Sequence, residues 1–104
     1  MRWTVQDRHA AGEHSEGTVG IFIRTRAWIY GTTNSWSLSP RGHEPSAECE
    51  VLLEIRGDEK QGYHLTMNPT GFFTADSWHA TQQEALRTAT ELFGVAPEKW
   101  RNDP

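Results

Sequence analysis

The chain has 104 residues, enough for one modest hydrophobic core, so residues 1–104 are treated as a single domain. Hydrophobic residues make up only 36% of the chain, but five Trp, four Phe and two Tyr supply large apolar surfaces for that core. The formal net charge of −4 argues against general binding to nucleic acid or anionic membranes, and it suits a basic protein partner.

Cysteine content and hydropathy indicate the compartment. A single cysteine excludes an internal disulfide and suits a reducing cytoplasm. No apolar run approaches the ~18–20 residues that span a bilayer, and the N-terminus lacks the apolar centre of a signal peptide. These features predict a bacterial, cytoplasmic protein.

The first half of the chain contains two or three expected strands. Residues Arg2–Gln6 are expected to form a short first strand, and Asp7–Gly17 a loop, since it lacks periodicity and holds two glycines. Apolar residues alternate through Thr18–Tyr30, which predicts a strand. Thr32–Ser39 is expected to form a turn and a short strand, and Pro40–Pro45 a loop.

Glu48–Arg56 is the clearest strand of the sequence. One of its faces is apolar, made by Cys49, Val51, Leu53 and Ile55. Gly57–Gly62 is expected to turn the chain, with residues 58–60 as the loop. This loop places Glu54 opposite His64 on the following strand, whose apolar side is Tyr63, Leu65 and Met67.

Asn68-Pro69-Thr70-Gly71 predicts a second hairpin turn. Proline suits the second position of a type I turn, and glycine suits the left-handed bulge residue that follows it. This turn pairs Met67 with Phe73, and Leu65 with Ala75. A two-residue loop is the alternative, but it would turn Asp76 inward, where a buried carboxylate needs a charged partner.

The last quarter of the chain predicts a helix. Thr81 and Glu84 match a capping box, and Gly94 followed by Pro97 matches a helix end. Five apolar residues repeat at three- and four-residue spacing: Ala85, Leu86, Ala89, Leu92 and Phe93. The predicted fold is therefore α+β, an antiparallel meander of four to five strands with one C-terminal helix packed on one face.

Two hypotheses concern the sheet face away from the helix. The first is a recognition surface, because the register turns Leu52, Phe72 and Trp78 outward among carboxylates. The alternative for these aromatics is cover by another part of the chain or by a second subunit. The second hypothesis is a row of Glu54, His64 and Asp76, which could orient a general base or contribute to a metal site.

A cross-strand charge pair on a solvated face is the simpler interpretation of that row, because neither a nucleophile nor a closed set of metal ligands accompanies it. We therefore expect no metal and no cofactor. Cys49 alternates with core residues and is expected to behave as a small buried hydrophobic side chain.

The C-terminal quarter resembles a family of small bacterial proteins with no settled activity. The shared pattern is Trp78-His79, Glu84-Ala85, Phe93-Gly94-Val95 and a closing Trp100. The resemblance implies a compact structural tail, in which a Trp-bearing strand enters a helix that ends at Phe-Gly, and it implies no catalytic residues.

These observations favour a non-enzymatic protein-binding module. A specific version is an immunity protein, the antitoxin that binds a basic toxin. The alternatives are a small enzyme or metal-binding protein that uses Glu54, His64 and Asp76, and a homodimeric structural protein.

Overall fold

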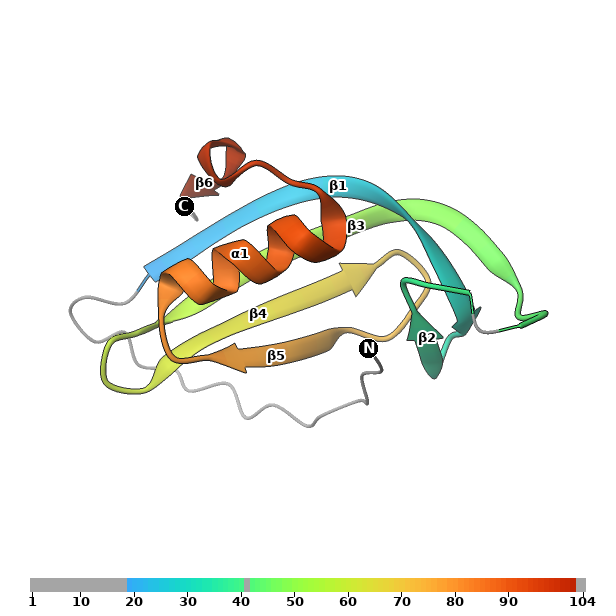
Figure 1. Ribbon diagram of the computed structural model, residues 1–104, viewed down its shortest axis with the longest axis horizontal. Coiled ribbons are helices and arrows are strands. Elements are labelled where there is room, and N and C mark those ends of the chain that lie inside the picture. Colours follow the sequence, from blue (N-terminus) through green and yellow to red (C-terminus); the bar gives the residue numbers. More distant parts are fainter. Residues whose placement is uncertain (1–18, 41, 103–104) are drawn as a thin grey trace.

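The computed structural model describes residues 19–40 and 42–102 (Figure 1). The expected first strand Arg2–Gln6 and the loop Asp7–Gly17 lie outside the described residues. The elements, in chain order, are β1 (Val19–Thr32), β2 (Ser35–Ser37), β3 (Ser46–Asp58), β4 (Gly62–Pro69), β5 (Ala75–His79), α1 (Gln82–Phe93), the 3-10 turn η1 (Pro97–Lys99) and β6 (Arg101–Asn102).

The described strands form one antiparallel sheet in the order β2-β1-β3-β4-β5, and β6 pairs with the start of β1. The helix α1 lies over one face of this sheet, and the predicted α+β class is confirmed (Figure 1). The described residues form six strands rather than four to five, because the tail after the helix returns to pair with β1.

Alternation decides which side chains of the two long strands face the helix. In β3, Val51, Leu53 and Ile55 are fully buried, and the residues between them are half-buried or exposed. Tetrahedral Cα geometry turns successive side chains to opposite faces of a strand, so an alternating sequence buries one face only. The predicted face of β3 is confirmed, and β1 and β3 each extend two residues beyond the predicted C-terminal end.

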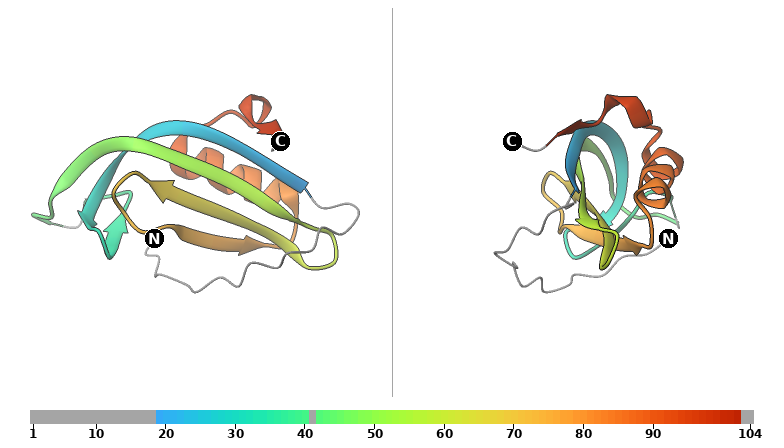
Figure 2. Two further views of the ribbon diagram at one scale, coloured as in Figure 1. Left: turned by 180° about the vertical axis from the view of Figure 1, so that it is seen from behind. Right: turned by 90° about the vertical axis from the view of Figure 1, so that its left-hand side faces the viewer.

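The sheet curls into a half-barrel at the end that carries β2 (Figure 2). Two hydrogen bonds join the β1–β2 hairpin to the connection between β4 and β5. The Phe73 amide donates to the carbonyl of Thr33 at 3.0 Å, and Trp36 Nε1 donates to the carbonyl of Phe73 at 3.0 Å. β2 pairs with β1 in the sheet, and these two bonds also place it next to residues 70–74, which connect β4 to β5.

Both predicted hairpin registers are wrong by two residues. Glu54 lies opposite Thr66, not His64, and Met67 lies opposite Ala75, not Phe73. In the first hairpin the strands continue to Asp58 and Gly62. The carboxylate of Asp58 accepts from the backbone amides of the turn, at 3.0 Å from Lys60 and 2.7 Å from Gln61, and this fixes the turn one residue later than expected.

In the second hairpin Pro69 is the first residue of the turn, not the second. The Phe72 amide donates to the Pro69 carbonyl at 3.1 Å, and Gly71 takes a φ of 89°. Pro69 still belongs to β4, where it lies opposite Val51. A shift of two residues keeps the side chains that remain in the strands on their predicted faces but changes their neighbours.

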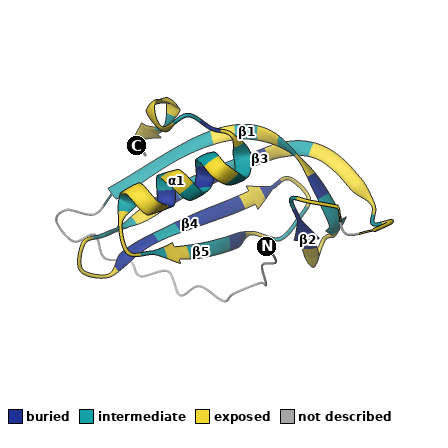
Figure 3. Cartoon of the chain, viewed as in Figure 1, coloured by how far each residue is buried: buried dark blue, intermediate teal, exposed yellow. Residues whose placement is uncertain are grey.

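The helix begins and ends where the sequence predicts. The Thr81 hydroxyl accepts from the Glu84 amide at 3.1 Å, while the Glu84 carboxylate accepts from the Ala80 amide, one residue before the cap. Gly94 ends the helix with a φ of 71°. The small residues Ala85 and Ala89 are buried, and the larger apolar residues of the stripe are half-buried (Figure 3). The helix α1 therefore approaches the sheet most closely at these two alanines.

Candidate protein-binding surface

The sheet face away from α1, called the outer face here, is made by alternate residues of four strands. It carries Phe22, Arg24, Arg26 and Trp28 from β1, Glu48, Glu50, Leu52, Glu54 and Arg56 from β3, His64, Thr66 and Asn68 from β4, and Asp76 and Trp78 from β5. The described part of the chain places no helix over this face (Figure 2). An antiparallel sheet with one helix leaves such a face for solvent or for a partner.

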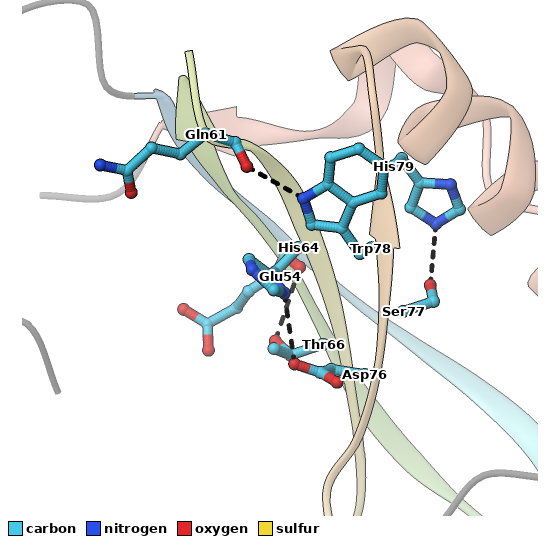
Figure 4. Close-up of polar contacts among 8 residues, drawn as sticks. All are labelled: Glu54, Gln61, His64, Thr66, Asp76, Ser77, Trp78 and His79. Atoms are coloured by element: carbon cyan, nitrogen blue, oxygen red, sulfur yellow. Dashed lines mark hydrogen bonds and ion pairs between the residues drawn. The ribbon is translucent and has the colours of Figure 1, made fainter. Parts of the chain in front are cut away.

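Trp78 is exposed on the outer face, as predicted, and it is held in place. Its side chain is 57% exposed, yet the indole Nε1 donates to the carbonyl of Gln61 at 3.0 Å (Figure 4). The ring also lies against Gly62, where a Cβ atom would overlap it. A fixed aromatic ring loses little conformational entropy on binding, which makes Trp78 a suitable anchor for a partner.

The expected cluster of Trp78 with Leu52 and Phe72 does not form. Leu52 lies opposite Asn68 and Trp78 lies opposite His64, so about 13 Å of strand separates them. Phe72 belongs to the connection after β4, where it is half-buried against the core. The shifted turn removes Phe72 from the strand, and the distance along the strands separates Leu52 from Trp78, so the predicted cluster is wrong.

Of the predicted row, only His64 and Asp76 are brought together. His64 Nδ1 lies 3.5 Å from Asp76 Oδ2, and the Asp76 side chain is only 8% exposed. Glu54 instead forms an ion pair with Arg56 at 3.0 Å. Thr66 lies directly opposite both Glu54 and Asp76, and its hydroxyl donates to the Glu54 carbonyl at 3.5 Å.

This arrangement weakens the interpretation of the row as a catalytic or metal site. A general base needs an orienting partner within hydrogen-bond reach, and the Glu54 carboxylate is engaged elsewhere. Among the residues described, no group of three His, Cys, Asp or Glu side chains is placed to hold a metal ion.

The outer face carries basic side chains as well as the expected carboxylates. Arginines of β1 and β3 accompany its carboxylates, in the pairs Arg24–Glu50 at 3.9 Å, Arg26–Glu48 at 3.6 Å and Arg56–Glu54 at 3.0 Å. Exposed pairs of this kind contribute about 0–1 kcal/mol to stability, so their main effect is to balance charge on the surface.

Trp28 is a surface residue that sequence reasoning missed. It lies on β1 opposite Glu48 and is 51% exposed on the outer face. The alternation of the strand contains the signal, because Trp28 shares the parity of Arg24 and Arg26. About 26 Å of strand separates it from Trp78, so the outer face carries one exposed Trp near each end.

A second polar pair, also missed, lies on the helix side of β5. Ser77 Oγ is 2.8 Å from His79 Nε2. Burial lowers the pKa of His79 because it disfavours the imidazolium, and the nearby Glu84 carboxylate partly offsets this shift. Residues two apart on one strand share a face, and that spacing is the signal in the sequence.

Cys49 should react more slowly with a thiol reagent in the folded protein than in denaturant, by about tenfold or more. Its side chain is half-buried on the helix side of β3, and burial raises the pKa of the thiol. Because the thiolate is the reactive form, the folded rate should still increase at a pH where the denatured rate has levelled off. Absorbance-monitored labelling against pH measures both, and equal rates in the two states would contradict the burial of Cys49.

Comparisons with models of protein families, with curated proteins and with solved structures find no match. The resemblance of the C-terminal quarter to a small bacterial family therefore stays a prediction. In the described ranges no helix is both long and apolar enough to cross a membrane.

Proposed function

We propose that the protein is a non-enzymatic protein-binding module whose outer face contacts the partner. The observation that carries this proposal is the exposure of Trp28 and Trp78 on a sheet face that no described helix covers. Tryptophan is enriched among the residues that dominate binding energy at interfaces, and large exposed aromatics are unfavourable in water.

A basic protein is the partner that the charge of the chain suits best. The net charge of −4 speeds encounter with a positively charged protein, although the outer face itself is nearly balanced. A cytoplasmic immunity protein, the antitoxin of a basic toxin, is one protein of this description. A second copy of the chain on the same face is the alternative occupant.

Trp78→Ala should weaken binding of the partner by about 2 kcal/mol or more, a roughly 30-fold rise in Kd. The partner is first isolated from the source cell with the wild-type chain and identified, and its Kd is then measured for each variant by calorimetry. Trp78→Phe is the first control, because it keeps an aromatic ring against Gly62 while losing the bond to Gln61.

Glu91→Ala is the second control, since Glu91 is exposed on α1 and should leave the Kd unchanged. Loss of folding in Trp78→Ala with unchanged affinity in Trp78→Phe and Trp28→Ala would show that the tryptophans have structural roles only. A solution mass of two chains, reduced to one by Trp78→Ala, would instead identify the second copy as the occupant.

A further inference from the structure

Among the described residues, strands pair with only part of the edge of β1 that faces away from β3. At one end β6 pairs with Ile21 and Phe22, and at the other end β2 pairs with residues 30–32. Between them, no described strand pairs with this edge (Figure 1). We define residues 24–28 as the open edge, and we leave out residues 23 and 29 because they directly adjoin the paired stretches of β1. Backbone N–H and C=O groups without strand partners there can accept another strand.

The side chains along the open edge alternate between the large residues Arg24, Arg26 and Trp28 and smaller ones. Arg24 and Arg26 face outward, whereas Thr25 and Ala27 face the helix side and are half-buried. Arg24 lies over the Phe22 ring at 5.6 Å, which orients its guanidinium. Both arginine side chains are about 60% exposed, and their β3 carboxylates are 3.6–3.9 Å away. Each guanidinium has five donors, so each can bind a further carboxylate.

We propose that the open edge binds an extended acidic peptide segment of a partner protein by strand addition. The backbone of the segment pairs with residues 24–28, its carboxylates lie beside Arg24 and Arg26, and its intervening small apolar residues lie beside Thr25 and Ala27. Main-chain bonds supply the affinity of such a complex, and alternate side chains supply its specificity. This site is independent of Trp78, which lies on β5 at the other border of the sheet.

A second copy of the chain does not fit the same edge. In an antiparallel pair centred on Arg26, residues 30 and 31 of the copy would fall where β6 already pairs with Phe22 and Ile21. Arginines of the two copies would also lie side by side, which is unfavourable. β2 and β6 therefore leave room on this edge for a peptide of about five residues, whereas a longer strand would collide with them.

The test uses the full chain and two synthetic peptides, acetyl-Val-Glu-Val-Glu-Val-amide and its analogue with lysine in place of glutamate. Amide hydrogen exchange followed by NMR should show that alternate amides of residues 24–28 slow by about tenfold or more with the glutamate peptide at millimolar concentration. The lysine peptide should bind at least about tenfold more weakly. No protection with either peptide, or equal binding of the two, would overturn the proposal.

Charge reversal supplies the matched control. Arg24→Glu combined with Arg26→Glu should reverse the preference, so that the lysine peptide binds more tightly. Arg87→Glu, at an exposed position of α1 on the other side of the sheet, should leave the preference unchanged. Slow exchange of residues 24–28 without peptide would show that the chain covers its own edge. If the amides of residues 24–28 exchange more slowly at higher protein concentration, a second copy of the chain covers the edge. Either result would overturn the proposal.

Discussion

Replacement of Trp36 with alanine is expected to lower the free energy of unfolding by about 3–5 kcal/mol. Trp36 is only 2% exposed, and its ring lies 5.7 Å from that of Phe73. Its indole nitrogen donates to the Phe73 carbonyl, so the substitution also leaves a backbone acceptor without this partner. Domains of this size are stable by about 5–15 kcal/mol, so the loss is a large fraction of the total, and urea denaturation followed by circular dichroism measures it.

Two other substitutions separate the causes of that loss. Trp36→Phe keeps most of the apolar area but removes the indole donor, and it should cost about 0.5–1.5 kcal/mol for the hydrogen bond, with a further cost for the smaller ring. Trp28→Ala removes the same side chain from an exposed position and should change stability by about 0.5 kcal/mol or less. Equal losses in Trp36→Ala and Trp28→Ala would contradict the attachment of β2 to residues 70–74.

Features governed by local chemistry could be predicted from the sequence. The helix ends follow from Thr81 and Gly94, whose cap geometry depends only on residues a few positions away. The buried face of β3 follows from alternation, which survives any even shift of register. For the same reason, Trp78 is exposed on the outer face although its predicted neighbours are wrong.

The register itself could not be predicted, because long-range contacts decide it. Asn68-Pro69-Thr70-Gly71 is compatible with a turn that starts at either Asn68 or Pro69. The later turn leaves Phe73 outside β5, and there it bonds to Thr33 and Trp36, about 40 residues earlier in the chain. The predicted Glu54–His64–Asp76 row depended on direct pairing, and the shift puts Thr66 in place of His64 between the two carboxylates. The later turn also leaves Phe72 outside β5, which removes it from the predicted cluster with Leu52 and Trp78.

Gly57→Ala is expected to lower the free energy of unfolding by about 2–5 kcal/mol, through two separate effects. Gly57 has a φ of 152°, in a region that residues with a side chain rarely occupy. A Cβ there would also collide with the carbonyl oxygen of Gly62 and lie 2.7 Å from the Cα of Tyr63. Both obstacles are backbone atoms of the paired strand, so neither can move away unless the β3–β4 hairpin opens.

Gly71→Ala is the matched control for the effect of conformation alone. Gly71 has a φ of 89°, but a Cβ there would meet no atom within 4 Å. Its replacement should cost about 1–2 kcal/mol, the cost of holding an L-residue in a left-handed conformation. The difference between the two variants therefore measures the close approach of β3 to β4 at Gly57. Equal costs would mean that this approach is absent and that the hairpin has a different register. The contacts of Trp78 with Gln61 and Gly62 would then be wrong as well, since both residues belong to the same hairpin.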